Sequence, residues 1–308
     1  LNLMLYIQNN KKENLYEVKE NINYLKEKFL NWFIINAVPT WKKFGIDYVN
    51  GGFFEALDKK LQPIEGPRRT RVICRQIYVF IVANKLGVKE DVENIIYEGF
   101  EYLLSKLKCR DGFFAYSYNN STKKNDNNVF LYEQAFVIFT LASLFNLDNK
   151  KYSETFELAL NLLRKVKDRW FSNEFEDIRL PIDKYQTDPY MHLLEGLLLW
   201  EEVLINTNSS NQILEFKNLS DTIVNIIFSK CSDKKYGFIS EEYSICWSKL
   251  EDEFVQIEPG HQYEWSWLLI KWSRFRNNHK DIKSFSLRLI KFAERYGLDR
   301  ERLLVVNS

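Results

Sequence analysis

Apolar residues recur at helical spacing along most of this chain, and this periodicity limits the possible folds more than any other feature. No segment keeps the strict alternation of a half-buried strand beyond short pieces of loop, and most of the 6 prolines fall between the periodic segments. An all-α fold is therefore predicted. We expect its helices over residues 16–37, 70–86, 89–107, 131–147, 151–168, 189–206, 211–229, 261–277 and 280–296.

The loops between these helices carry a repeated motif. "NGGFFEALD" (50–58), "RDGFFAYSY" (110–118) and "KYGFISEEYS" (235–244) each place Gly-Phe before a short alternating stretch, at intervals of about 60 and then about twice 60 residues. Two helices and one long loop per period predict a solenoid or ring of helix pairs, forming one domain over residues 1–308. An irregular helical domain whose loops agree by chance is the alternative.

Charge and cysteine content narrow the function classes. Lys plus Arg number 43 and Asp plus Glu 42, so no basic surplus indicates nucleic acid or an anionic membrane surface. The 4 cysteines stand far apart, which disfavours a zinc site or a disulfide framework. The longest apolar stretch, "LLEGLLLWEEVLI", is interrupted by acids. We expect a cytoplasmic protein with neither nucleic-acid nor membrane partners.

Two of the 3 histidines occur in matching positions. His192 and His261 each follow a proline break, and each has a glutamate three residues later, Glu195 and Glu264. We expect both pairs at the start of helices, facing one cavity, where the helix amino terminus favours a neutral imidazole that accepts protons. Glu264 would orient the His261 ring or bind a hydroxyl. Two local hydrogen bonds without catalytic meaning remain the alternative, and a metal is disfavoured because further ligands are scarce.

Arg75 is a third candidate. It shares a helix face with Val72 and Val79, where a lone guanidinium is costly unless oxygen atoms surround it. A substrate oxygen or a buried carboxylate would serve equally well. The nearby cluster Arg68, Arg69 and Arg71 is expected to be solvated, and it does not decide whether a phosphate binds.

Aromatic residues near the loops suit a carbohydrate ring, whose C–H faces stack on aromatic rings while its hydroxyls bond to carboxylates. Most aromatic residues will belong to the core, and a minority is expected to line the cavity. The candidates for substrate binding are Tyr48, Phe114, Trp247 and Trp265.

Several segments, in order, resemble the N-acylglucosamine 2-epimerase family, which also contains cellobiose 2-epimerases and mannose or sulfoquinovose-type aldose–ketose isomerases. The agreement runs from about residue 40 to residue 306. The segments are "GGFFEALD", "RRTRVICRQIYVF", "LYEQAFVIFTLASL", "DPYMHLLEGLLLWEE", "IEPGHQYEWSWLLIKW" and "AERYGLDRERLLVV". The resemblance implies an (α/α)6 barrel and a sugar substrate, with no redox cofactor.

The resemblance also implies roles for individual residues. A histidine in this family removes the C2 proton of an open-chain sugar, and the resulting cis-enediolate is reprotonated at C2 or C1. By motif, His261 is the general acid/base and Glu264 assists ring opening or orients the sugar. His192 and Glu195 contact the sugar ring, and Arg75 stabilises the enediolate oxygen.

One departure from the family pattern produces a further expectation. The family places a second acid/base histidine near the carboxyl end, and six periods of about 60 residues exceed the 308 present. We therefore expect about five of six helix pairs, weak activity, and self-association through an apolar seam between the helices near 16–37 and 280–296. The alternatives are an (α/α) glycoside hydrolase using Glu264 and Glu55, or an inactive sugar-binding fragment.

Overall fold

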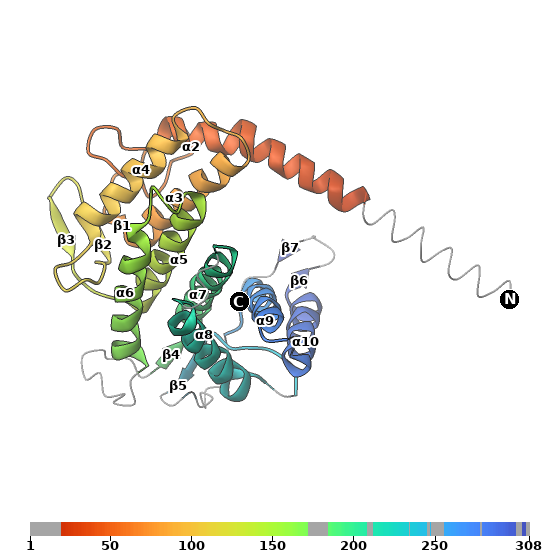
Figure 1. Cartoon of the computed structure of the whole chain (residues 1–308). Coiled ribbons are helices and arrows are strands. Elements are labelled where there is room, and N and C mark those ends of the chain that lie inside the picture. The colour runs from red at the N-terminus through yellow and green to blue at the C-terminus, as the bar shows by residue number, and fades with distance from the viewer. Residues whose placement is uncertain are drawn as a thin grey trace.

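Helices that alternate between an inner and an outer position carry the fold (Figure 1). The structure is a computed structural model of the chain. It describes residues 20–171, 184–207, 212–233, 235–244, 247, 256–277, 279–299 and 304–305. No helix in this part of the chain is both long enough and apolar enough to cross a membrane.

Four inner helices pack side by side in chain order, and each is followed by an outer helix that covers it. The inner helices are α3 (Thr70–Lys85), α5 (Leu131–Leu147), α7 (Asp188–Asn206) and α9 (Pro259–Phe275). The outer helices are α4 (Val92–Tyr102), α6 (Glu154–Trp170), α8 (Leu214–Ile226) and α10 (Lys280–Tyr296). Wide π-helical turns, Leu103–Leu107 and Ile227–Cys231, extend α4 and α8.

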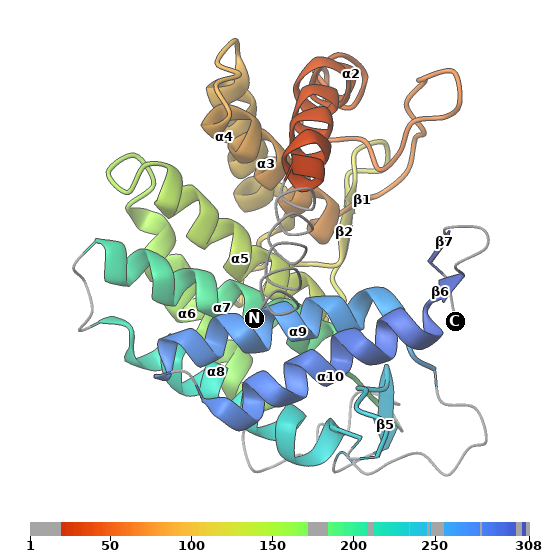
Figure 2. The same cartoon turned by 90° about the vertical axis from the view of Figure 1, so that its right-hand side faces the viewer.

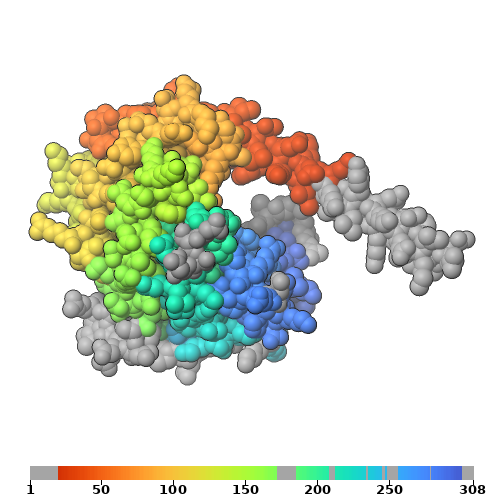
Figure 3. Space-filling model, viewed as in Figure 1, coloured from red at the N-terminus to blue at the C-terminus, as the bar shows by residue number. Residues whose placement is uncertain are grey.

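A further helical stretch precedes these pairs. It runs from residue 20 to residue 32, continues through a π-helical turn at Phe33–Ala37, and ends in α2 (Val38–Phe44). Together the described helices follow an arc that stays open between residues 20–37 and the α9–α10 hairpin (Figures 1 and 3). The predicted succession of helix pairs is confirmed, with four full pairs and this additional helical stretch in the described part of the chain.

Burial follows from the position of each helix in the arc. The inner helices α5 and α7 are apolar on nearly all sides, because each packs against an inner neighbour on both flanks and an outer helix behind. The outer helices α6 and α10 bury only one stripe and present charged residues to solvent. The core therefore lies between the two layers. Figure 2 shows α9 and α10 lying side by side as the last of these pairs.

Short antiparallel strands occupy the loops that lead into the inner helices. A three-stranded sheet has the order β1 (Arg68–Arg69), β2 (Ser117–Asn119) and β3 (Lys124–Asp126). A second sheet pairs β4 (Lys184–Gln186) with β5 (Glu242–Ser244), which joins the loop before α7 to the loop before α9. Near the end of the chain, β6 (Leu298–Asp299) pairs with β7 (Leu304–Val305).

The repeated Gly-Phe motif has a structural cause. Gly52, Gly112 and Gly237 all adopt positive φ, at 77°, 88° and 81°, a conformation that favours glycine. In the second and third loops, a glutamine side chain from the next inner helix then clamps the backbone. Gln134 bonds both N–H and C=O of Phe114, and Gln262 does the same to Ile239, each at 2.9 Å.

The expectation that Arg68, Arg69 and Arg71 are solvated is wrong. Arg68 has no solvent exposure, and its guanidinium stacks on Phe54 at 4.4 Å and pairs with Asp47 at 3.2 Å. Arg69 and Arg71 are half-buried and also pair with carboxylates, as described below. The β1–β2 pairing covers this stretch, so its cations need internal partners.

The helical stretch before the first pair presents a row of apolar side chains to solvent. Their exposed fractions range from 53% to 67%. The residues are Ile22, Tyr24, Leu25, Phe29, Trp32 and Ile35. The expected apolar surface near residues 16–37 is therefore present within 20–37, while self-association through it stays a prediction.

We predict that Arg68→Met destabilises the fold by about 3–5 kcal/mol, because it leaves the Asp47 carboxylate buried without its cation. The measurement is urea unfolding. The control is Arg164→Met, since Arg164 pairs with Glu215 at 2.7 Å on an exposed surface and its loss should leave the midpoint near wild type. Equal midpoints for the two variants would contradict the prediction.

We also predict concentration-dependent self-association through residues 20–37, because a contiguous apolar surface of this size favours contact with another copy. Sedimentation velocity would measure it. Phe29→Ser with Trp32→Ser should shift the population to smaller species, whereas Leu214→Ser with Tyr97→Ser, two exposed apolar residues elsewhere, should not. A wild-type chain that stays monomeric at all concentrations would refute this expectation.

Candidate active site

The first turns of the four inner helices meet at one end of the arc. Arg71 and Glu133 join α3 to α5, the rings of Tyr132 and Phe136 join α5 to α7, and an Asp188 carboxylate joins α7 to α9. We call this group the site cluster. Its members are Arg71, Arg75, Tyr132, Glu133, Phe136, Asp188, His192, Glu195, Glu241, His261 and Glu264.

His192 lies deep in the cluster between two carboxylates. Its Nε2 is 3.1 Å from Asp188 Oδ1 and its Nδ1 is 3.4 Å from Glu195 Oε2. The ring packs against Phe136 at 4.5 Å and Tyr132 at 5.3 Å, so only 9% of the side chain is exposed. Burial disfavours the charged ring, but the two carboxylates outweigh it and raise the pKa of His192 to about 9. This imidazole is therefore protonated at neutral pH.

His261 has a different partner from the one expected. Its Nδ1 is 2.8 Å from Oε2 of Glu241, which comes from the loop before α9 and not from Glu264. The Glu241 carboxylate raises the pKa of His261 above its ordinary value, against the effect of burial. The expectation that the helix terminus keeps this ring neutral is wrong in direction, because a carboxylate at hydrogen-bond distance outweighs the helix dipole.

The two histidines face the same oxygen atom. Asp188 Oδ1 lies 3.1 Å from His192 Nε2 and 3.9 Å from His261 Nε2, so the two Nε2 atoms are close neighbours. The two histidines are thus close in space, as their matching positions in the sequence predicted. Within the described residues, no group of three or more His, Cys, Asp or Glu side chains is arranged to hold a metal ion.

Glu264 lies beside both histidines and remains accessible to solvent. Partial burial in the cluster raises the pKa of its carboxyl group, and the nearby Glu195 and Asp188 carboxylates act in the same direction while the two histidines oppose them. Its exposed carboxylate is accessible to hydrogen-bond donors from outside the cluster.

Arg75 joins the cluster, but on an exposed face. Its guanidinium stacks on Phe136 at 4.4 Å and donates a hydrogen bond to Tyr132 Oη at 3.2 Å. Because Phe136 also packs against His192, Arg75 lies near that histidine, while its side chain is exposed. The burial argument made for Arg75 from the sequence was wrong, because the helix face that it shares with Val72 and Val79 is not buried. An exposed guanidinium on an aromatic platform remains available to a bound anion.

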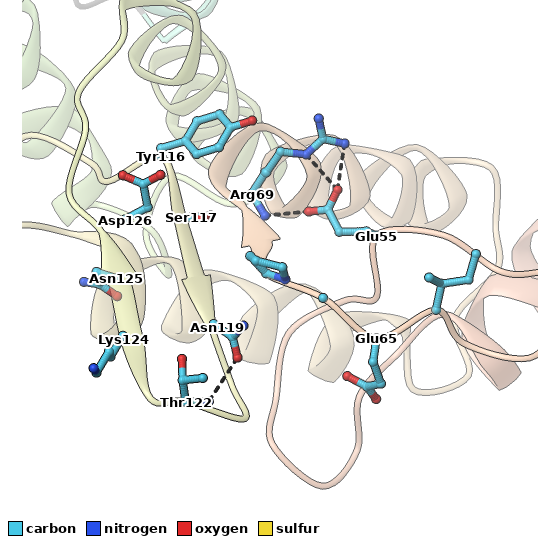
Figure 4. Close-up of a pocket in the computed structure, with 13 residues that line it drawn as sticks. Glu55, Glu65, Arg69, Tyr116, Ser117, Asn119, Thr122, Lys124, Asn125 and Asp126 are labelled. Atoms are coloured by element: carbon cyan, nitrogen blue, oxygen red, sulfur yellow. Dashed lines mark hydrogen bonds and ion pairs between the residues drawn. The ribbon is translucent and has the colours of Figure 1, made fainter.

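A pocket of about 590 Å³ adjoins the cluster (Figure 4). It lies between the loop around residues 55–67 and the β2–β3 hairpin, and Tyr116 forms part of its wall. The Tyr116 ring lies 5.5 Å from the Arg71 guanidinium, which connects the pocket to the site cluster. Inside the pocket, Arg69 pairs with Glu55 at 2.8 Å. In the site cluster, Arg71 pairs with Glu133 at 2.6 Å.

The structure does not place the four expected aromatic contacts at the cavity surface. Trp265, Phe114 and Trp247 are at most 6% exposed and pack in the core, because they point between layers of the fold. Trp247 lies on Tyr185 at 4.8 Å. Tyr48 is exposed, but it donates to the Lys42 carbonyl at 2.8 Å, away from the cluster. Tyr132 and Phe136 lie in the cluster, and Tyr116 lies beside it.

Sequence reasoning missed several members of the cluster. Asp188 precedes His192 by one helical turn, and this spacing could have identified it. Glu241 stands beside Glu242 in a loop, and nothing in the sequence distinguishes the two. Tyr132 and Phe136 lie on α5, which is apolar on nearly every side, so its periodicity does not show which face meets the cavity.

Comparison with known proteins agrees with this architecture. The sequence profile described as N-acylglucosamine 2-epimerase (GlcNAc 2-epimerase) matches residues 52–307. A mannose-6-phosphate isomerase of Rhizobium meliloti (strain 1021) is 30% identical over 281 residues, covering 89% of this chain and 70% of the relative. A cellobiose 2-epimerase of Dictyoglomus turgidum is 23% identical over 288 residues, covering 89% and 72%.

Solved structures show the same fold. A D-mannose isomerase superposes with a TM-score of 0.75 at 17% identity, covering 91% of this chain and 74% of that one. A GH76 α-mannanase of Bacteroides thetaiotaomicron superposes with a TM-score of 0.63 at 10% identity, covering 90% and 74%. At these identities the likeness concerns the fold alone, which is the expected toroid of the (α/α)6 type, and this chain covers 74% of each of these two solved chains.

The profile match covers most of the chain and the isomerase relative reaches 30% identity over most of its length. The chain therefore belongs to the N-acylglucosamine 2-epimerase family.

Proposed function

We propose that this chain interconverts an unphosphorylated aldose of the mannose or N-acylglucosamine type with its C2 epimer or its ketose, with His261 as the base. Membership of the family makes the chain a carbohydrate isomerase or epimerase. The observation that supports the assignment of roles is that two imidazoles flank one Asp188 oxygen, and that each has a further carboxylate partner of its own.

His261 is arranged as a base. Its Nδ1–H donates to Glu241 at 2.8 Å, which fixes the tautomer and leaves the Nε2 lone pair free. In an open-chain aldose the C2–H bond is adjacent to the carbonyl, so proton removal gives an enediolate. The raised pKa of His261 makes its neutral form a stronger base, at the cost of a smaller neutral fraction at low pH.

The remaining cluster residues suit the other charges of the reaction. Protonated His192 is a proton donor to a sugar oxygen, and the exposed guanidinium of Arg75 stabilises the enediolate oxygen. Glu195 holds His192, and Glu264 accepts a hydrogen bond from a hydroxyl group. Return of the proton to C2 from the other face gives the epimer, and its return to C1 gives the ketose.

The charges of the site favour a neutral sugar over a sugar phosphate. Arg69, which lines the pocket, and its neighbours Arg68 and Arg71 are each held by a carboxylate, and Lys124 is the other cation in the pocket lining. Asp188, Glu195, Glu241 and Glu264 add negative charge around the histidines, and a phosphate dianion would meet this field with Arg75 and protonated His192 as its counter-charges. Mannose is therefore the preferred probe and mannose 6-phosphate its charged comparison.

The hydrolase alternative has no geometric support. Glu55 is held by Arg69 in the pocket at 2.8 Å, whereas Glu264 interacts with the two histidines and their carboxylates. A glycoside hydrolase needs two carboxyl groups that face one bond across a gap. The hydrolase hypothesis also gives the paired histidines no role.

We predict that His261→Asn lowers C2 proton exchange by at least about 100-fold, because the variant lacks the base. The measurement is NMR of mannose in D2O, following deuterium at C2 and the appearance of ketose. The control is His279→Asn, since His279 lies at the start of α10 beside Trp272 and outside the cluster. Unchanged exchange in the His261 variant would move the base elsewhere.

The pH dependence follows from the same two groups. The rate should rise with pH as His261 loses its proton, at a pKa above the ordinary 6.5, and fall near pH 9 as His192 loses its own. A rate that keeps rising past pH 10 would exclude protonated His192 as the donor.

We predict that Arg75→Lys lowers kcat by at least about 10-fold, because lysine keeps the charge but loses the planar fork that stacks on Phe136. Steady-state kinetics with mannose would measure it. Arg164→Lys is the matched control on the outer surface, and its kinetics should stay at the wild-type level. Wild-type turnover in the Arg75 variant would remove this residue from the mechanism.

A further inference from the structure

Asp188 holds a position that the reaction scheme above does not use. It is the first residue of α7, four residues before His192, and its Oδ1 atom is shielded from solvent. This oxygen accepts no well-directed hydrogen bond, although His192 Nε2 lies at 3.1 Å and His261 Nε2 at 3.9 Å. A buried carboxylate oxygen without a directed donor is costly unless nearby positive charge compensates it.

The outer nitrogen of each ring has a carboxylate of its own. Glu195 faces Nδ1 of His192 and Glu241 faces Nδ1 of His261, so the order across the site is carboxylate, imidazole, carboxylate, imidazole, carboxylate. Asp188 is the central member. It is also the member of this row that contacts both imidazoles in the described part of the chain.

We propose that Asp188 is a positioning residue that couples the protonation of His192 and His261, so that the pair holds one proton at His192 while His261 stays available as the base. The inference rests on the proposed function for its catalytic meaning. Its physical content, the coupling of two titrations through one oxygen, is independent of any substrate.

The geometry gives the coupling a direction. His192 has two carboxylates within 3.4 Å, those of Asp188 and Glu195. Among the residues that the structure describes, His261 has one at that range, Glu241 at 2.8 Å, so the first proton is held on His192. When His261 then accepts a proton from C2, the new positive charge forms 3.9 Å from the same Asp188 oxygen, which stabilises it. The base therefore becomes charged without a carboxylate having to move into place.

Other charged groups act on both rings and must be counted. Arg75 on α3 stacks on Phe136, which packs against His192, and Glu264 on α9 interacts electrostatically with both imidazoles. The titratable and charged groups around the pair are Arg75, Tyr132, Glu195, Glu241 and Glu264. Asp188 differs from all of them in its contact with both Nε2 atoms.

Histidine NMR tests the coupling directly, because the chain has 3 histidines and His279 serves as an internal reference. Three isosteric variants form a matched set. Asp188→Asn should lower the pKa of His192 by about one unit or more and shift the titration of His261 as well. Glu195→Gln should shift the titration of His192 more than that of His261, and Glu241→Gln should do the reverse.

The outcomes separate the coupling from simpler roles. The proposal would be overturned if Asp188→Asn shifted the titration of neither histidine, or shifted the titration of His192 alone. Asp188→Glu keeps the negative charge, so His192 should titrate in this variant as it does in the wild type. If Asp188→Asn does not fold, the titration of Asp188→Glu decides the question. A low pKa for His192 in a folded Asp188→Glu protein would count against the proposal.

A kinetic experiment tests whether the coupling of the two titrations affects the reaction. In Asp188→Asn the high-pH limb of the kcat profile with mannose should move to lower pH by the same amount as the titration of His192. If no variant or wild-type chain acts on any aldose, the proposed function fails, yet the NMR titrations still decide the coupling. If activity persists with an unshifted profile, the coupling fails and the proposed function stands.

Discussion

The site depends on one geometric constraint, which is that the inner helices all begin at the same end of the molecule. Only then do the first turns of α3, α5, α7 and α9 bring cations, aromatic rings and imidazoles into contact. The connecting loops must return the chain to that end after every outer helix. The positive-φ glycines turn these loops, and the amide clamps of Gln134 and Gln262 hold two of them in register with the next helix.

The electrostatic design of the cluster follows from this packing. Carboxylates from α7, α9 and the preceding loop surround two imidazoles, and the deeper imidazole carries the proton. Burial alone would have discharged His192, so its charge is maintained by close partners against a desolvation cost. A polyol that offers many hydroxyl donors suits such an acceptor-rich site better than an anion does.

Apolar periodicity and proline breaks were sufficient to predict the helices and the meeting of His192 with His261, because both features are local and repeat along the chain. What the sequence could not show were contacts between distant segments. Glu241 reaches His261 from a loop, Arg68 becomes buried because a strand covers it, and Trp265 points into the core, although sequence position alone made a cavity role equally plausible. Each of these depends on which face of an element meets its neighbour.

The opposite end of the arc holds turns that join inner helices to their outer helices. Short turns near residues 86–91 and 148–153 join inner helices to outer ones there, and the 16-residue helix α3 alone sets the two ends about 24 Å apart. Because the site draws its described residues from the other end, these turns can change in length or sequence without disturbing the chemistry. Evolution and protein engineers thus have a second surface on which tethers, fusion partners or immobilisation points can be added independently of catalysis.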